Sequence, residues 1–302
     1  MHTRLVCAYF RPSYAKRFLR GILTFFDAFA KIVYMKKFDF DATYFSPIAT
    51  LDCGQTFRFY PFKDGFFVVS RDKACYVWSD GVKTVIESDD CDYFYNYFDL
   101  ARDYKSVVER AKAFDIPLLN KCAEFGKGIR ILNQDREETI FSFIISQNNN
   151  IPRIKSIIEK TCSALGEKKT FLGREYSTFP TTYQISKMDK AFFRGLGAGY
   201  RDEFICETAK KILKDGILHL ENCDGATLKK ELLNFKGVGD KVADCICLFA
   251  FGKTENFPVD TWIEKIFRED FGGTIKDRKK INAYFCQLFG ADAGIIQQYL
   301  FY

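Results

Sequence analysis

The chain has 302 residues and a formal net charge of +6 at pH 7, with 47% hydrophobic and 28% charged residues. This balance is typical of a globular protein and excludes a disordered, collagen-like or coiled-coil chain. The uncharged apolar runs, such as 245–252, are much shorter than the roughly 18 residues of a membrane span, so none is predicted. Only two histidines are present, which leaves little material for a His-rich metal site or a Ser-His-Asp triad.

Most of the positive charge lies at the start of the chain. Residues 1–34 hold six basic side chains and one acidic side chain, so the rest carries a net charge of only +1. Global basicity is therefore no evidence for DNA binding. Because Met35 is followed at once by two lysines, this stretch has three interpretations: a targeting-like segment, a surface helix, or translation from a start codon upstream of the real one.

The 11 cysteines include no C-x-x-C pair, and their number is odd. This usage favours a reducing intracellular compartment over a disulfide framework. We therefore expect an intracellular protein, in the cytoplasm or nucleoid of a bacterium or in the nucleus of a eukaryote.

The first predicted elements are strands. From Thr56 to Ser88, short β-rich runs alternate with turn signals, which are Lys63-Asp64-Gly65, Arg71-Asp72-Lys73 and Ser79-Asp80-Gly81. Their spacing of about eight residues predicts an antiparallel meander.

After about Tyr104 the apolar period becomes helical, and no further strand pattern is apparent. The clearest helical segments are 137–146, 154–165, 202–213, 228–235 and 281–289. The sequence thus predicts an α+β protein with a small antiparallel β domain followed by an all-α region. The expected boundaries are a basic extension at 1–36, the β domain at 37–128 and the helical region at 129–302, with a helical hairpin at 228–251.

The hairpin is the most informative stretch. A helix is predicted to end at Phe235 and another to begin near Asp240, with Gly237-Val238-Gly239 between them. Glycines allow the backbone conformations of a tight turn and let a phosphate approach its N–H groups. Such a helix-hairpin-helix grips a DNA backbone without reading its sequence. The ordinary alternative is a helix C-cap followed by a loop.

Two ionisable residues follow the hairpin. Lys241 lies in the first turn of an apolar helix with Cys245 four residues later, and Asp260 follows in a Phe-Pro-Val-Asp run. We expect the helix dipole and partial burial to lower the pKa of Lys241, which would suit a Schiff-base nucleophile. Asp260 suits the N-cap of a helix beginning at Thr261, and this role is compatible with a catalytic one.

These features resemble the helix-hairpin-helix (HhH-GPD) superfamily of DNA glycosylases, and further stretches resemble its 8-oxoguanine DNA glycosylase branch. The matching stretches are Gly54-Gln55-Thr56-Phe57-Arg58, 146–154 (Ser-Gln-Asn-Asn-Asn-Ile-Pro-Arg-Ile), 196–201 (Leu-Gly-Ala-Gly-Tyr-Arg) and Ala293-Gly294 with Gln297 and Phe301. Order and spacing are kept from about residue 40 to the end. The resemblance implies a TBP-like N-terminal β domain and two helical subdomains.

The resemblance also implies a bifunctional DNA N-glycosylase and AP lyase of base excision repair. Lys241 would attack the anomeric carbon, and Asp260 would stabilise the positive charge on the sugar. The flipped 8-oxoguanine would stack between Cys245 and Phe301, with Gln297 on its Watson–Crick edge and the Gly54 carbonyl on the ring nitrogen that oxidation turns into a donor. By composition alone, Cys245 and Phe301 are ordinary core residues.

Other matched residues are implied to contact the DNA duplex. Tyr200 would wedge into the base stack and Asn148 would fill the vacated space, although a surface aromatic and a loop asparagine are the ordinary interpretations. Arg153 and Arg201 would reach the orphaned base, which implies a preference for cytosine opposite the lesion. Gly237, Val238 and Gly239 would hold the DNA backbone.

The chain departs from the family pattern at Trp262, where eukaryotic members commonly have a histidine that contacts phosphate. Only Cys286 follows Cys247, so we expect no iron-sulfur cluster, and no zinc or other cofactor. In relatives the hairpin carbonyls can hold a monovalent cation, and no other metal is implied. The expected partner is double-stranded DNA containing oxidised guanine, bound by a monomer without a membrane.

Two other functions compete. A monofunctional alkylpurine glycosylase of the same fold activates water with the aspartate and has no use for Lys241. A non-enzymatic hairpin module would use Lys241 as a phosphate contact and Asp260 only as a cap. Borohydride trapping separates both from the Schiff-base enzyme.

Overall fold

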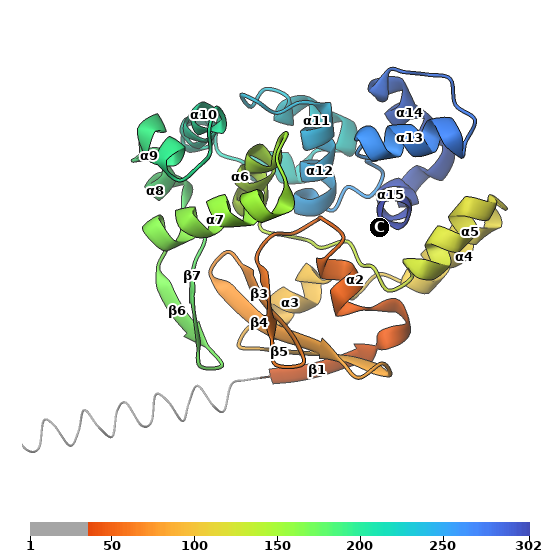
Figure 1. Cartoon of the computed structure of the whole chain (residues 1–302), viewed down its shortest axis with the longest axis horizontal. Helices are drawn as coiled ribbons and strands as arrows, with labels where there is room; N and C mark the ends of the chain where they lie inside the picture. The colour runs from red at the N-terminus through yellow and green to blue at the C-terminus, as the bar shows by residue number, and fades with distance from the viewer. Residues whose placement is uncertain (1–35) are drawn as a thin grey trace, which may run out of the picture.

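The computed structural model describes residues 36–302, so the basic extension lies almost wholly outside the described part. Its N-terminal part contains a five-stranded antiparallel sheet with the strand order β1-β5-β4-β3-β2 (Figure 1). The strands are β1 Lys36–Asp41, β2 Phe59–Phe62, β3 Gly65–Ser70, β4 Lys73–Ser79 and β5 Lys83–Ser88. The meander predicted between Thr56 and Ser88 is confirmed, and its turns fall at the predicted positions.

Both faces of this sheet are buried. One face, with Val68, Val77 and Ile86, packs on aromatic residues in and after helix α3 (Cys91–Tyr97). The other face, with Phe67 and Tyr76, packs on a two-stranded hairpin formed by β6 (Lys168–Phe171) and β7 (Arg174–Ser177). A layer on each face explains why β4 is buried at four successive positions instead of alternating.

Three strands were missing from the sequence prediction. β1 pairs with β5 and completes the sheet. Its Phe38 and Phe40 alternate with Lys37, Asp39 and Asp41, a strand pattern that the prediction overlooked. The expectation of no strand beyond Tyr104 was wrong, because β6 and β7 form there. These are short, charged strands that are held by packing on the sheet, a tertiary cause that sequence periodicity does not register.

Apart from β6 and β7, the described chain after Tyr104 is mainly helical, as predicted. The helices are α2 Pro47–Leu51, α4 Tyr104–Ala113, α5 Pro117–Phe125, α6 Arg136–Ser146, α7 Ile151–Leu165, α8 Thr182–Ser186, α9 Lys190–Gly195, α10 Arg201–Asp215, α11 Gly225–Leu232, α12 Asp240–Phe251, α13 Thr261–Glu269, α14 Arg278–Phe289 and α15 Ala293–Phe301. Within residues 36–302, no helix is both long and apolar enough to cross a membrane.

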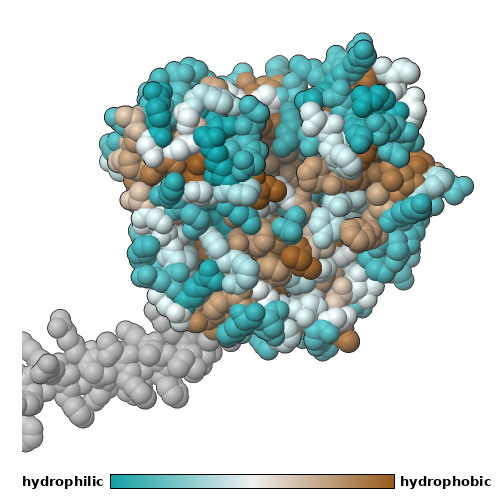
Figure 2. All heavy atoms as spheres, in the orientation of Figure 1, coloured by the Kyte–Doolittle hydropathy of each residue, from teal (hydrophilic) through white to brown (hydrophobic). Residues whose placement is uncertain are grey.

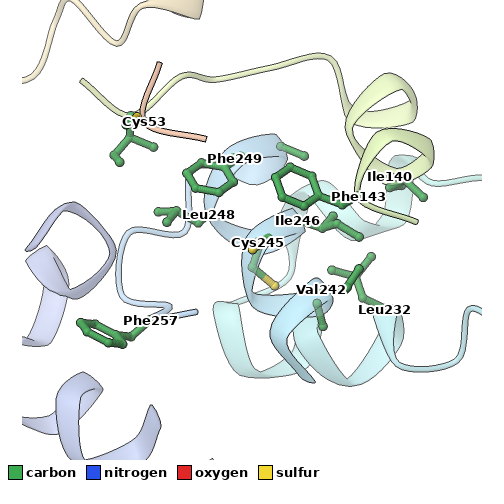
Figure 3. Close-up of a cluster of buried hydrophobic side chains, with 14 of the residues drawn as sticks. Cys53, Ile140, Phe143, Leu232, Val242, Cys245, Ile246, Leu248, Phe249 and Phe257 are labelled. Atoms are coloured by element: carbon green, nitrogen blue, oxygen red, sulfur yellow. The ribbon is translucent and has the colours of Figure 1, made fainter. Parts of the chain in front are cut away.

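Helix α12 is the centre of the largest core. All residues from Val242 to Ala250 are buried, because α12 is enclosed by α6, α11, the loop before α13, and α15. Figure 3 shows Phe143 of α6, Leu232 of α11 and Phe257 of the loop arranged around this helix. A helix that is apolar on every side needs such an enclosure.

A polar network ties the residues after the sheet to α2. Gln55 donates from Nε2 to the carbonyl oxygens of Thr50 and Arg130 and accepts from the backbone N–H of Leu132. The buried Arg130 guanidinium in turn donates to backbone carbonyls, those of Tyr44, Phe98, Asp99 and Arg102. Buried polar groups are tolerated when they are hydrogen-bonded in this way, and the network holds the loop that contains Gly54 in one place.

Candidate active site

The helical hairpin consists of α11, a tight turn and α12. Gly237 has φ +84°, and a Cβ atom there would lie 2.3 Å from the ring of Phe204, so both conformation and space require glycine. Gly239 is the N-cap of α12, and no atom lies within 4 Å of the place where its Cβ would stand. Because no side chain caps this helix, its first N–H groups can receive a ligand such as a phosphate.

Lys241, in the first turn of α12, is solvent accessible at the mouth of a small pocket. The Cys245 sulfur, which is hydrogen-bonded to Lys241, and Asp260 raise the pKa of Lys241 above its usual value, while partial desolvation opposes them. The expected lowering of this pKa was therefore wrong, because a local sulfur and carboxylate outweigh the dipole and burial. Lys241 rests as an ammonium and must lose a proton before it can act as a nucleophile.

Asp260 is the N-cap of α13. Its Oδ1 accepts from the backbone N–H groups of Trp262 and Ile263, at 3.0 and 2.9 Å. The predicted cap is thus confirmed, and it holds the carboxylate in the pocket wall near Lys241.

The pocket is formed where α2, α6, α12, α13 and α15 meet. It has a volume of about 50 Å³ and is lined by Cys53, Gly54, Phe143, Lys241, Cys245, Phe249, Pro258, Asp260, Gln297, Gln298 and Phe301. Figure 2 shows apolar side chains gathered in the middle of the molecule, between the sheet and the helices above it. The structure therefore brings together both residues predicted to be catalytic and all four predicted to hold the base.

The four predicted base contacts come from three separate segments. Gly54 has φ +81°, and a Cβ there would lie 3.4 Å from the Phe301 ring. Cys245 is buried on α12, and burial raises the pKa of its thiol, with the ammonium of Lys241 opposing. Gln297 and Phe301, both on α15, are 3% and 36% exposed. A cavity of 50 Å³ holds a few water molecules but is too small for a purine.

Three predicted DNA contacts lie on exposed loops and helix ends. Asn148 has φ +44°, a left-handed conformation that asparagine adopts more readily than most residues. Arg153, on α7, is exposed and donates from its guanidinium to the Gly197 carbonyl at 3.0 Å. Tyr200 is 52% exposed just before α10.

Arg201 is buried, unlike Arg153. It is only 3% exposed, and its guanidinium donates to the carbonyl oxygens of Gln147, Asn148 and Ala198. These bonds support the loop that presents Asn148 and Tyr200. Most guanidinium donors of Arg201 are therefore engaged by backbone carbonyls, and its expected reach to an orphaned base stays a prediction.

Two further features of the site were missed from the sequence. Gln298 lines the pocket beside Gln297; the signal was a Gln-Gln pair inside an otherwise apolar helix. The buried Asp244 pairs with Lys229 of α11. The sequence signal for it was a carboxylate within the otherwise apolar sequence of α12. Within residues 36–302, His, Cys, Asp and Glu side chains form no group of three that could hold a metal ion.

Two protein-family models match this chain. Residues 141–290 match the family model of the HhH-GPD superfamily of base excision DNA repair proteins, and residues 37–140 match that of the 8-oxoguanine DNA glycosylase N-terminal domain. The fold is that of this superfamily. Within it, the chain belongs to the 8-oxoguanine DNA glycosylase family.

Similar proteins agree with this membership. The structure of MBOgg1 in complex with a low affinity DNA ligand is 32% identical, with a TM-score of 0.83, and the match covers 88% of this chain and 96% of that one. The Clostridium acetobutylicum 8-oxoguanine glycosylase/lyase, in complex with double-stranded DNA containing cytosine opposite 8-oxoG, is also 32% identical, with a TM-score of 0.82 and the same coverage.

Curated relatives are matched over shorter stretches. The N-glycosylase/DNA lyase of Saccharomyces cerevisiae is 38% identical over 48% of this chain and 42% of its own length. The chain spans less than two thirds of the length of three curated relatives that it matches, namely 42%, 65% and 54%. The 3-methyladenine DNA glycosylase of Archaeoglobus fulgidus, 18% identical with a TM-score of 0.71, shares the fold.

Proposed function

We propose that the protein excises 8-oxoguanine from double-stranded DNA and then cleaves the strand at the abasic site. The observation that carries this proposal is the shared pocket, where Lys241 and Asp260 stand beside the four side chains and backbone groups suited to an oxidised purine. Family membership supports it, as do relatives named N-glycosylase/DNA lyase.

Lys241 and Asp260 have different roles in the reaction. After Lys241 loses a proton, its Nζ forms a bond to C1′ while the bond from C1′ to the base breaks, and the base leaves with that electron pair and gains a proton. The Asp260 carboxylate stabilises the positive charge on the sugar at that moment. Ring opening gives an imine on Lys241, and loss of a C2′ proton then expels the 3′ phosphate, which cleaves the strand by β-elimination.

The lesion is distinguished from guanine at Gly54. Oxidation turns a ring nitrogen from an acceptor into a donor, so the Gly54 carbonyl bonds the lesion but faces a lone pair in guanine. A buried acceptor left unpaired costs about 1–3 kcal/mol, which gives roughly tenfold to hundredfold discrimination. Gating during base flipping supplies the remainder.

The surrounding surface fits a DNA duplex. Lys241 also lines an open hollow of about 390 Å³ with Gly239, on the hairpin side of the helix. We assign the hairpin turn Gly237 to Gly239 to the DNA backbone, Tyr200 and Asn148 to the gap left by the flipped base, and Arg153 to the orphaned cytosine.

Borohydride trapping tests the proposal. Wild-type protein should become covalently linked to duplex DNA with 8-oxoguanine opposite cytosine, and Lys241→Gln should abolish trapping and excision while lesion binding persists. Lys214→Gln, a matched change of an exposed lysine in the last turn of α10, should keep both activities. Excision without trapping would identify a monofunctional glycosylase, and binding without excision would identify a non-enzymatic module.

A further inference from the structure

The side chain of Gln298 contains a buried hydrogen-bond acceptor without a partner. Gln298 lies on α15, is 4% exposed and lines the pocket with Gln297. Its Nε2 donates to Gln297 Oε1 at 2.7 Å, whereas its own Oε1 has no partner within residues 36–302. An unpaired buried acceptor is unfavourable in the free protein, which makes it a place where a bound molecule can complete the hydrogen bonding.

The bond between the two glutamines also orients Gln297. Because Gln297 Oε1 already accepts from Gln298, its amide is held with Nε2 on the other side, and this Nε2 makes no hydrogen bond within the described residues. An amide has one acceptor oxygen and one donor nitrogen, so the pair offers one donor and one acceptor to a molecule in the pocket.

We propose that Gln298 is a specificity-determining residue that reads the base together with Gln297. Guanine and 8-oxoguanine present an acceptor, O6, beside the donors N1–H and the 2-amino group. Gln297 Nε2 donates to O6, and Gln298 Oε1 accepts from the donor part of the same edge. This inference rests on the proposed function, because it assumes that the base enters this pocket.

The same arrangement rejects an adenine-type base. The Watson–Crick edge of 8-oxoadenine has a donor where O6 stands and an acceptor where N1–H stands, so both contacts become repulsive. Gln297 could serve this base only by turning its amide over, and that rotation would break the 2.7 Å bond from Gln298. A site built to hydrogen-bond one pattern discriminates strongly because a mismatch leaves buried groups unpaired.

Single-turnover excision of 8-oxoguanine and 8-oxoadenine, each opposite cytosine, tests the inference. The ratio of the two rates should favour 8-oxoguanine in the wild type and should fall about tenfold or more in Gln298→Met, where Gln297 is free to turn over. Differences between the two duplexes cancel when the ratio is compared between proteins. The matched control is Gln287→Met on the exposed side of α14, which should keep the wild-type ratio.

A second variant covers the case in which the apolar substitution impairs folding. Gln298→Glu has the same shape, but above the carboxyl pKa it can only accept, so Gln297 should turn its Nε2 toward it and present Oε1 to the base. The ratio should then fall at least as far as in Gln298→Met. Wild-type ratios in folded Gln298→Met or Gln298→Glu overturn the inference while the proposed function stands. Wild-type protein that neither excises nor traps overturns both.

Discussion

Asp244 Oδ1 lies 2.9 Å from Lys229 Nζ, and this pair joins the two helices of the hairpin. Asn282 of α14 donates both to Asp244 and to the carbonyl oxygen of Phe257, three residues before Asp260. Asp244 and Asn282 therefore link α12, the helix that carries Lys241, to the loop that leads to Asp260.

The burial of Asp244 predicts how stability depends on pH. Burial raises the pKa of Asp244 from 3.8 to about 6, with Lys229 opposing. Between these values the folded protein binds a proton that the unfolded chain does not, so this group's contribution to stability falls as the pH rises. Relative to Asp244→Asn, the wild-type free energy of unfolding should decrease by up to about 3 kcal/mol between pH 4 and pH 7.

Denaturant unfolding of both proteins across this pH range measures the difference. Asp215→Asn is a matched control, because Asp215 is paired with Lys211, which lowers its pKa. The difference in unfolding free energy between Asp215→Asn and the wild type should change with pH in the opposite direction, because the stabilising contribution of Asp215 is lost as the pH falls. A difference in unfolding free energy between the wild type and Asp244→Asn that does not change with pH would contradict the raised pKa of Asp244.

Asp260→Asn should separate charge from capping. The asparagine oxygen can still accept from the N–H groups of Trp262 and Ile263, so the thermal midpoint of unfolding should change little. The lost charge–dipole interaction should lower the unfolding free energy by no more than roughly 1 kcal/mol. Excision should slow by about 10²–10³-fold because the sugar cation loses its carboxylate. A large loss of stability with normal excision would show that Asp260 is only a cap.

Arg153→Ala and Arg201→Ala should have different effects. Arg153 is exposed, so its removal should leave stability unchanged but narrow the preference for cytosine over adenine opposite the lesion, measured as excision rates against all four bases. Arg201 is buried on three carbonyls, so its removal should lower the unfolding free energy by about 1–3 kcal/mol. Unchanged base preference in Arg153→Ala would exclude contact with the orphaned base.

Alanine substitutions of the two hairpin glycines should have different effects on stability and on DNA affinity. Gly237→Ala must adopt φ +84° with its Cβ against Phe204, so it should destabilise the protein by about 1–3 kcal/mol. Gly239→Ala has an ordinary φ and open space, so its unfolding midpoint should stay close to that of the wild type. DNA affinity should fall for Gly239→Ala, because its methyl group stands where a phosphate would approach. Equal stability losses would contradict this division.

The sequence alone determined the class of fold and most of the site. The turn signals and apolar spacing are local, so β2 to β5 and α6, α7 and α10 could be predicted from them. Lys241, Cys245 and Asp260 belong to one short run of chain, and the cap of α13 follows from the type of residue at its start. The charged hairpin β6–β7 could not be predicted, since packing on the distant sheet stabilises it. The alternation of Phe38 and Phe40 in β1 was present in the sequence and was overlooked.

Only the tertiary structure decided which groups are free to act. Arg201 and Arg153 are the same residue type, but one is enclosed with three carbonyls as partners and the other is exposed. The pKa of Lys241 depends on a sulfur and a carboxylate brought beside it by folding, which reversed the direction expected from its helix position. Gln298 likewise acquired its unpaired oxygen from the packing of α15, because hydrogen bonding and burial depend on neighbours that are distant in sequence.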